Sequence, residues 1–386
     1  MSERGDVQPG AVAVVRCDGY SVDRVRSAVH RGIDLLGGTA RFARRGERIL
    51  LKPNLLVPRA PERAVTTHPS VFRAVAETFK EAGAVLSYGD SPGFGSTVLA
   101  ARRAGLTQVA EELGVSLADF GTSEQISFPD GRLIKQFTFA KGALDADGIV
   151  SLPKLKTHGL TRITGAIKNQ FGCIVGALKP EFHARLPNAD LFSQMLVDLN
   201  RCLRPRLFVT DGVVAMEGNG PQSGRTRPMN VLLFSDDPVA SDATVCRMIG
   251  LDVALVLPLV YGEAFGLGRT TGMQLLGDPI EDFVLEDFDV NRSPRSTTDA
   301  PGRVSRLARR WVVPRPVIRA ERCTRCGTCV EVCPVTPKAV RFSDDARLCA
   351  PEHDYRRCIR CYCCQEMCPE QAIEVDVPWL GRFVRR

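Results

Sequence analysis

The chain has 386 residues, more than one ordinary hydrophobic core holds, so its length predicts two or three domains. Hydrophobic residues (44%) and charged residues (25%) occur in the proportions of a globular protein, and the longest apolar run, Leu251 to Val260, is too short to span a bilayer. The segment 292–322 contains nine arginines and two acidic residues, and this excess equals the net charge of +7 of the whole chain. The rest of the chain is therefore balanced in charge, which argues against a nucleic-acid-binding groove there. The polar N-terminus lacks the layout of a secretory signal, so we expect a cytoplasmic protein without a transmembrane segment.

Strand-like and helix-like segments alternate through the first 290 residues. Short apolar runs predict the strands, and apolar residues at helical spacing between capping residues and glycines predict the helices. In chain order, the expected elements are a strand at Ala11–Val15, a helix at 21–36, a strand at Ile49–Leu51, a helix at Pro69–Ala82, a strand at Val85–Tyr88, a helix from Ser96, a helix at Asn188–Leu203, strands at Leu207–Val209 and Val231–Phe234, and a helix at Pro238–Ile249. The alternation implies right-handed crossovers, so we predict an α/β domain with a mainly parallel sheet flanked by helices.

A segment rich in proline and arginine then interrupts this pattern. We therefore predict a large domain at residues 1–290, a linker at 291–315 and a small domain at 316–386. Within residues 303–322, apolar residues share helical spacing among the arginines. A short basic helix that contacts a partner or a membrane surface is the alternative to a solvated linker.

The small domain is defined by its cysteines, because ten of the fourteen in the chain lie between Cys323 and Cys368. They form the pattern Cys-x-x-Cys-x-x-Cys-x-x-x-Cys-Pro twice, which is the spacing of bacterial ferredoxins with two [4Fe–4S] clusters. In that arrangement the fourth cysteine of each motif binds the cluster of the other motif. One cluster would be bound by Cys323, Cys326, Cys329 and Cys368, and the other by Cys358, Cys361, Cys364 and Cys333.

Zinc is the alternative to iron–sulfur clusters, but two pairs of cysteines satisfy zinc, and the third cysteine of each motif would have no use. We therefore predict a small α+β ferredoxin-like domain that its two clusters help to keep folded. Two of its cysteines are left over: Cys349 lies between the motifs, and Cys363 could bind only if the register shifted. The four cysteines of the large domain are expected to be buried apolar residues; they are Cys17, Cys173, Cys202 and Cys246.

Basic and amide side chains of the large domain gather in a few polar motifs. No aspartate or glutamate occurs from Leu152 to Lys179, although lysines recur there among glycines and apolar residues. A pocket for a carboxylate or phosphate has this composition, and a basic surface loop is the alternative. The predicted substrate-binding residues are Lys52, Asn54, Lys154, Lys156, Lys168, Asn169 and Lys179.

Histidines and aspartates near these motifs are candidates for proton transfer. Because histidine ordinarily titrates near neutral pH, we expect His158 or His183 to deliver protons. Asp90 and Asp211 follow predicted strands, where α/β proteins bind ligands, and we expect them to complete the site as acid, base or metal ligand. Asp237 is better explained as the N-cap of the helix that follows it. The chain contains neither a Walker A loop nor a GxGxxG motif after a strand, so the usual signatures for ATP and NAD are absent.

Together these motifs resemble the family defined by domain of unknown function 362. The resemblance covers most of residues 11–285. It rests on six segments: Lys52–Asn54, Gly89–Gly93, Lys154–His158, Gly165–Gly172, Asp211-Gly212 and Glu217–Pro221. Members often carry a C-terminal two-cluster ferredoxin module, as this chain does. The resemblance implies an iron–sulfur protein of redox metabolism and provides no established reaction.

Three functions are compatible with the sequence. In the first, an iron–sulfur oxidoreductase takes single electrons from a donor protein and passes them to an anionic small molecule in the large domain, where nearby cations stabilise the added charge. In the second, the protein is a non-catalytic electron-transfer subunit. In the third, it is a redox sensor or an assembly protein. The sequence does not indicate whether a flavin or a further metal takes part.

Overall fold

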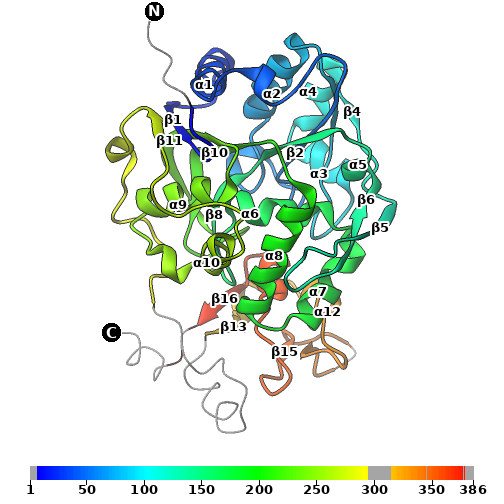
Figure 1. Ribbon diagram of the computed structural model, residues 1–386. Coiled ribbons are helices and arrows are strands. Elements are labelled where there is room, and N and C mark those ends of the chain that lie inside the picture. The colour runs from blue at the N-terminus through cyan, green and yellow to red at the C-terminus, as the bar shows by residue number, and fades with distance from the viewer. Residues whose placement is uncertain (1–6, 294–313, 345, 377, 379–386) are drawn as a thin grey trace, which may run out of the picture.

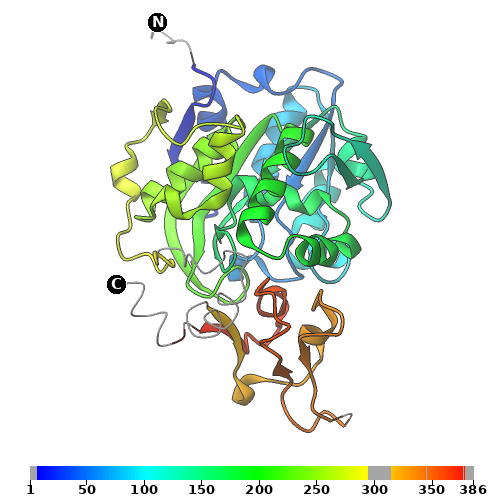
Figure 2. The same cartoon turned by 60° about the horizontal axis from the view of Figure 1, so that its bottom comes forward.

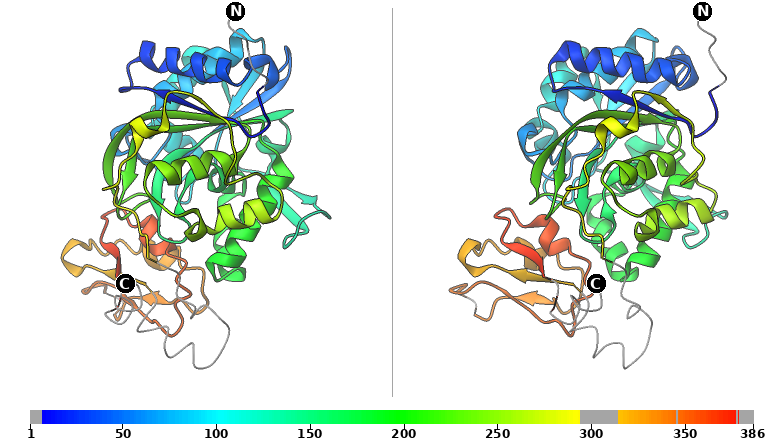
Figure 3. Two further views of the ribbon diagram at one scale, coloured as in Figure 1. Left: turned by 60° about the vertical axis from the view of Figure 1, so that its left-hand side comes forward. Right: turned by 90° about the vertical axis from the view of Figure 1, so that its left-hand side faces the viewer.

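The computed structural model describes residues 7–293, 314–344, 346–376 and 378. A large α/β domain with helices on both faces of one sheet forms most of the molecule, and a small module of short strands and helices lies against one end of it (Figures 1 and 2). The views in Figure 3 place this module at the opposite end of the molecule from α1 (Val22–Leu35). The expected fold class, α/β with a small α+β module, is therefore confirmed. No helix of the described residues is long and apolar enough to cross a membrane.

The large sheet is mixed, with its parallel part in the middle and at one side. Its strand order is β12 (Leu275–Gly277), β1 (Val12–Arg16), β11 (Arg225–Ser235), β10 (Leu207–Glu217), β7 (Gly148–Leu152), β2 (Arg48–Pro53), β3 (Val85–Tyr88) and β4 (Ser116–Leu117). The strands from β10 to β4 run parallel, whereas β11 is antiparallel to both β1 and β10. Strand β8 (Lys154–His158) also pairs with β10, and β9 (Arg162–Ile163) pairs with β8. The carboxyl ends of the parallel strands therefore meet at one edge of the sheet.

Two hydrophobic cores cover the two faces of the sheet. On β2, Ile49 and Leu51 point into one core while Leu50 points into the other, because successive side chains of a strand alternate between faces. One face packs against α1, α2 (Pro69–Glu81), α3 (Thr97–Arg103) and α4 (Leu106–Leu113). The other packs against α5 (Lys141–Leu144), α6 (Gly165–Asn169), α8 (Ala189–Leu203), α9 (Pro238–Met248), α10 (Leu257–Ala264) and the hairpin of β5 (Ser123–Ser127) and β6 (Gln136–Ala140). Helix α7 (Lys179–Arg185) lies beside this second core through Phe182.

Local sequence signals located most of these elements correctly. Asn188 caps α8 by accepting a hydrogen bond from the backbone N–H of Leu191, and Asp237 caps α9 as expected. The strands predicted at Leu207–Val209 and Val231–Phe234 are longer in the structure, where they form one long antiparallel hairpin, β10–β11. Asp211 consequently lies inside β10 and does not follow a strand, which corrects the expectation from the sequence.

The small module is held by short antiparallel pairings. Strand β13 (Arg315–Ile318) pairs with β16 (Ile373–Asp376), and β14 (Val340–Arg341) pairs with β15 (Glu352–His353), while α12 (Thr328–Glu331) and α13 (Cys363–Met367) each carry cysteines. Arg319 and Arg322 both form ion pairs with Glu374 of β16, so part of the basic stretch stabilises the module itself. The rest of the proposed basic helix, residues 303–313, lies outside the described residues.

Candidate functional site

The cysteines of the module surround two separate cavities. One cavity is lined by Cys323, Cys326, Cys329 and Cys368. The other is lined by Cys333, Cys358, Cys361 and Cys364. Each set contains three cysteines of one motif and the fourth cysteine of the other, which is the grouping that the sequence spacing predicts.

Four thiolates are the usual ligand set of a [4Fe–4S] cubane, and each cavity has four thiols in its lining. Among the described residues, no three His, Cys, Asp or Glu side chains converge on a point where one metal ion could sit. Burial, together with the neighbouring thiols, raises the pKa of Cys329 to about 12, so its thiolate form requires a positive centre close by.

The remaining cysteines fall into different environments. Cys17, Cys173 and Cys246 are buried among apolar residues of the large domain, as expected. Cys349 is exposed. Cys363 is buried at the start of α13, where its thiol hydrogen-bonds to that of Cys361.

A buried ion pair joins two of the predicted motifs at the carboxyl edge of the sheet. Lys52 Nζ lies 2.9 Å from Asp90 Oδ1, and the side chains are 0% and 4% exposed. The same ammonium donates to the carbonyl oxygen of Pro53 and to Asn169 Oδ1, and Asp90 Oδ2 accepts from the backbone N–H of Leu55 at 2.6 Å. The three donors of Lys52 are therefore all used within the fold.

Lys156 continues this network from the neighbouring strand β8. Its Nζ donates to Asn54 Oδ1 at 2.7 Å and to the carbonyl oxygen of Val65 at 2.6 Å, which leaves one donor of the ammonium free. Asn54 in turn donates through Nδ2 to Asn169 Oδ1 at 3.3 Å. Because Lys156 is buried and Lys168 adds a like charge nearby, the pKa of Lys156 is held well below its ordinary value.

A second buried network uses the other predicted pair. Lys154 Nζ lies 2.8 Å from Asp211 Oδ2, a pairing set by the register of β8 against β10. Tyr20 bridges them, since its hydroxyl accepts from Lys154 at 2.6 Å and donates to Asp211 Oδ1 at 2.8 Å. The ring of His68 stacks on Tyr20 with centroids 3.5 Å apart. Lys154 and Asp211 thus neutralise each other, and Tyr20 and His68 are partners that the sequence analysis missed.

Lys168 differs from the other predicted substrate-binding lysines because its ammonium makes no hydrogen bond or ion pair with any residue that the structure describes. It is half-buried at the end of α6. Its charge nevertheless shifts the pKa values of several buried or half-buried groups around it. These groups are Lys156, His158, Lys179, His183 and Glu366. All three of its donors are therefore available to an anion.

Lys179 and His183 extend the same region from α7. Lys179 donates to the backbone carbonyl oxygens of Ser91 and Pro92, and burial lowers its pKa to about 8. His183 packs between the rings of Phe171 and Phe192, and its Nδ1 has no partner among the described residues. Burial lowers the pKa of His183 to about 4, so the imidazole is neutral at physiological pH.

The small module contributes a carboxylate to this region. Glu366 Oε1 of α13 lies 2.8 Å from His158 Nε2, and both side chains are almost fully buried. His158 Nδ1 accepts from the backbone N–H groups of Leu160 and Thr161, so the proton of its neutral ring is on Nε2, facing Glu366. Burial opposes ionisation of Glu366, but the facing His158 and Lys168 hold its pKa below the ordinary value. Burial also lowers the pKa of His158.

Further contacts fix α13 against the large domain. Gln365 Nε2 donates to Asn219 Oδ1 at 2.8 Å, and Gln222 Nε2 donates to the carbonyl oxygens of Glu366 and Cys368. Met367 packs with Val57, Val65 and Met216 in a small apolar cluster. The turn Glu217–Pro221, which the sequence singled out, therefore serves as part of the docking surface for the module.

Glu366 and His353 are residues that the sequence analysis did not identify. Glu366 lies between the third and fourth cysteines of the second motif, where the spacing drew attention to the cysteines alone. His353 Nε2 lies 3.4 Å from Cys364 Sγ, and burial lowers the pKa of this histidine to about 4. In both cases the partner is distant in sequence or in another element, so no local signal pointed to the contact.

Comparisons with known proteins agree with these features. The model of domain of unknown function 362 (DUF362) matches residues 49–247, and a 4Fe–4S binding domain matches residues 316–336. The thylakoid-associated protein sll1697 of Synechocystis is 34% identical over 261 residues, which are 67% of this chain and 81% of that protein. A solved structure, the lactate racemase apoprotein of Thermoanaerobacterium thermosaccharolyticum, matches 62% of this chain and 56% of its own chain at 14% identity and a TM-score of 0.39, a likeness too loose to carry an argument. The chain therefore belongs to the DUF362 family and carries a 4Fe–4S binding domain at its C-terminal side.

Proposed function

We propose that the protein is an iron–sulfur oxidoreductase that reduces an anionic small molecule held between the large domain and the cysteine module. The observation that carries this proposal is the position of Glu366. It lies on α13 between Cys364 and Cys368, one cysteine of each set, and it meets His158 at the edge of the lysine cluster. The cysteine cavities and the cationic region are thus one helix apart.

The cysteines would hold two [4Fe–4S] clusters in the grouping described above. When bound, such clusters supply electrons one at a time. Cys326 is the exposed member of its set, which favours that side of the module for contact with an electron-donor protein. The thylakoid-associated relative is compatible with a role in electron transfer, although its name records a location and no reaction.

The residues of the large domain divide into a frame and a contact set. Lys52, Asn54, Asn169 and Asp90 use their polar atoms on one another and form the frame, as do Lys154 and Asp211. Lys168 would bind the substrate with its free ammonium, aided by the remaining donors of Lys156 and Lys179. Because reduction adds negative charge to the substrate, these cations would stabilise the product side of the reaction more than the reactant side.

Two histidines are placed to hold protons beside this set. His158 carries its proton on Nε2, and His183 has an unpartnered Nδ1. In the proposal, His158 or His183 relays a solvent proton to the reduced substrate: the ring takes up a proton to form the imidazolium and returns to the neutral form when it gives that proton up. Glu366 would stabilise the charged form of His158.

The test is reoxidation of the anaerobically reduced protein by metabolite fractions rich in carboxylates or phosphates, followed by visible absorbance and electron paramagnetic resonance. The variants are Lys168→Ala and, as a matched control, Lys141→Ala, which removes an exposed lysine at the start of α5. A fraction that reoxidises the wild type and the control but leaves Lys168→Ala reduced supports the proposal. If all three proteins respond alike, or none responds, a non-catalytic electron carrier becomes the better account.

A further inference from the structure

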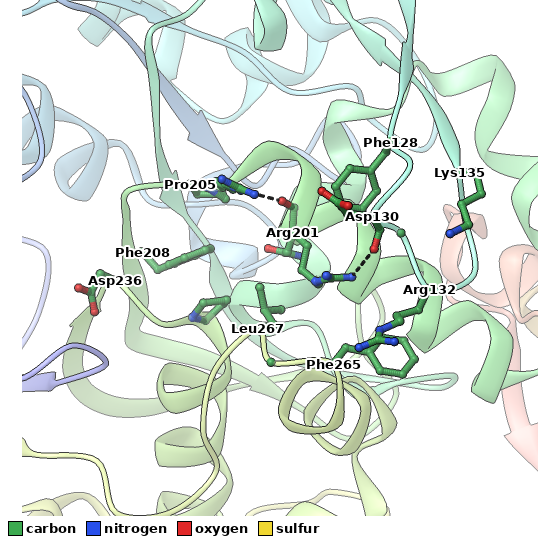
Figure 4. Close-up of a pocket in the computed structure, with 15 residues that line it drawn as sticks. Phe128, Asp130, Arg132, Lys135, Arg201, Pro205, Phe208, Asp236, Phe265 and Leu267 are labelled. Atoms are coloured by element: carbon green, nitrogen blue, oxygen red, sulfur yellow. Dashed lines mark hydrogen bonds between the residues drawn. The ribbon is translucent and has the colours of Figure 1, made fainter.

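A large cleft lies at the opposite edge of the sheet from the cysteine module. It has a volume of about 810 Å³ and is formed by the β5–β6 turn, the end of α8, the start of β10 and the loop after α10 (Figure 4). The cleft begins where β10 begins, whereas the redox site lies beyond the carboxyl ends of the parallel strands. Its volume is in the range of pockets that bind small molecules.

Basic side chains dominate the charged lining of the cleft. Its four cations are Arg132, Lys135, Arg201 and Arg204, and its two acids are Asp130 and Asp236. Asp236 is already neutralised from outside the lining, because it forms an ion pair with Arg41 at 2.5 Å and accepts from the backbone N–H of Gly10 at 3.0 Å. Arg201 is likewise paired from outside the lining, with Asp198 at 3.3 Å. Asp130 is left to balance Arg132, Lys135 and Arg204, so the cleft favours an anion.

The buried carboxylate of Asp198 fixes the wall that carries two of these arginines. It accepts hydrogen bonds from the backbone N–H groups of Arg132, Leu133 and Ile134 at 2.7–2.9 Å, and Arg201 Nη1 lies 3.3 Å away. Arg201 also donates to the carbonyl oxygen of Asp130. The wall is therefore preorganised, and a bound anion would not have to order it.

Two arginines keep free donors at this wall. The guanidinium of Arg132 makes no hydrogen bond or ion pair with a described residue, although Arg132 lines the cleft. Arg204 uses only Nε, which donates to the carbonyl oxygen of Arg201 at 3.2 Å. A guanidinium group with free N–H donors matches the geometry of a phosphate.

The floor of the cleft contains an unsatisfied acceptor. Asn200 is 0% exposed, and its Nδ2 donates to the carbonyl oxygens of Ile167 and Leu196, both at 2.8 Å. These two bonds fix the orientation of the amide, and they leave Asn200 Oδ1 without a donor among the described residues. A buried acceptor of this kind is stabilised by a hydroxyl or amine hydrogen from a bound molecule.

We propose that this cleft binds a phosphorylated polyol, a molecule of the sugar-phosphate class. The phosphate interacts with one of the two guanidinium groups that have free donors, that of Arg132 or that of Arg204, and a hydroxyl group of the polyol donates to Asn200 Oδ1. The site is separate from the redox site and does not depend on the function proposed for it. Because Asn200 also binds the carbonyl oxygen of Ile167, the residue before Lys168, the cleft is in direct hydrogen-bonded contact with α6.

The experiment is calorimetric titration of the full-length protein, with its clusters, using ribose 5-phosphate and, separately, inorganic phosphate. Arg132→Gln or Arg204→Gln, whichever removes the phosphate contact, is expected to weaken ribose 5-phosphate binding by about tenfold or more, the effect of losing one charge-assisted contact. Arg102→Gln, at an exposed arginine on α3, is the matched control and should bind like the wild type. Iron content and the far-ultraviolet circular dichroism spectrum verify that every variant is folded.

The two probes separate the parts of the proposal. Binding of ribose 5-phosphate about tenfold or more tighter than inorganic phosphate supports a contribution from the polyol, and equal affinities overturn that part. Absence of binding by ribose 5-phosphate at millimolar concentration overturns the proposal. Equal affinities of the arginine variants and Arg102→Gln would place the binding outside this cleft and overturn it as well.

Discussion

The buried pair of Lys52 and Asp90 allows a quantitative test of whether these residues form the frame of the site. Their charged atoms are 2.9 Å apart, and neither side chain has appreciable exposure. Removing one partner of such a pair leaves an uncompensated buried charge, which costs about 3–5 kcal/mol. We therefore expect Lys52→Met and Asp90→Asn each to lower the free energy of unfolding by about that amount.

The double variant should lose less than the sum of the single losses, because it buries no unpaired charge. A coupling energy of about 1–3 kcal/mol between the two sites is expected from direct contact. Urea unfolding under anaerobic conditions, followed by far-ultraviolet circular dichroism with a test of reversibility, provides the three values. The exposed pair of Glu181 and Arg185 serves as the control cycle, with an expected coupling of about 0.5 kcal/mol or less.

A coupling energy for Lys52 and Asp90 as small as that of the control pair would refute the reasoning. It would mean that the two charges do not depend on each other for stability, so their contact would not be part of a structural frame. Both residues would then return to the set of candidate substrate contacts.

Three further predictions concern α6 and the cysteines. Gly165→Ala should lower the free energy of unfolding by about 1–3 kcal/mol, measured by thermal melting, because Gly165 has φ of 56° and an added Cβ would lie 2.2 Å from Asp242 Oδ1. Burial raises the pKa of Asp242 to about 7, so between about pH 4 and about pH 7 the unfolded chain loses this proton while the folded protein keeps it. The free energy of unfolding of the wild type should therefore fall by up to about 4 kcal/mol as the pH rises through that range. Urea titrations at several pH values should show that Asp242→Asn lacks this contribution. Cys364→Ser should lose about half of the bound iron in a colorimetric iron assay, whereas Cys349→Ser, at an exposed cysteine, should lose none.

The amino-acid sequence by itself determined the local elements and the cysteine grouping. Strand β3 and helices α2 and α8 were placed to within about two residues, because capping residues and apolar periodicity act over short distances. The two cysteine motifs predicted the same two sets that surround the cavities, because tight loops bring residues three apart to one centre whatever surrounds them. The concentration of lysines in the segment 152–179 likewise indicated where charge would gather.

The tertiary structure decided which charged side chains neutralise each other and which stay available. From composition, Lys52, Lys154 and Lys168 were equally good candidates for contacts with the substrate. Sheet register and loop packing place an aspartate against Lys52 and another against Lys154, whereas no described aspartate pairs with Lys168. Glu366 meets His158 only because α13 docks on the carboxyl edge of the sheet. These pairings join residues more than thirty positions apart, and their energies depend on distance and burial, which no local pattern in the sequence contains.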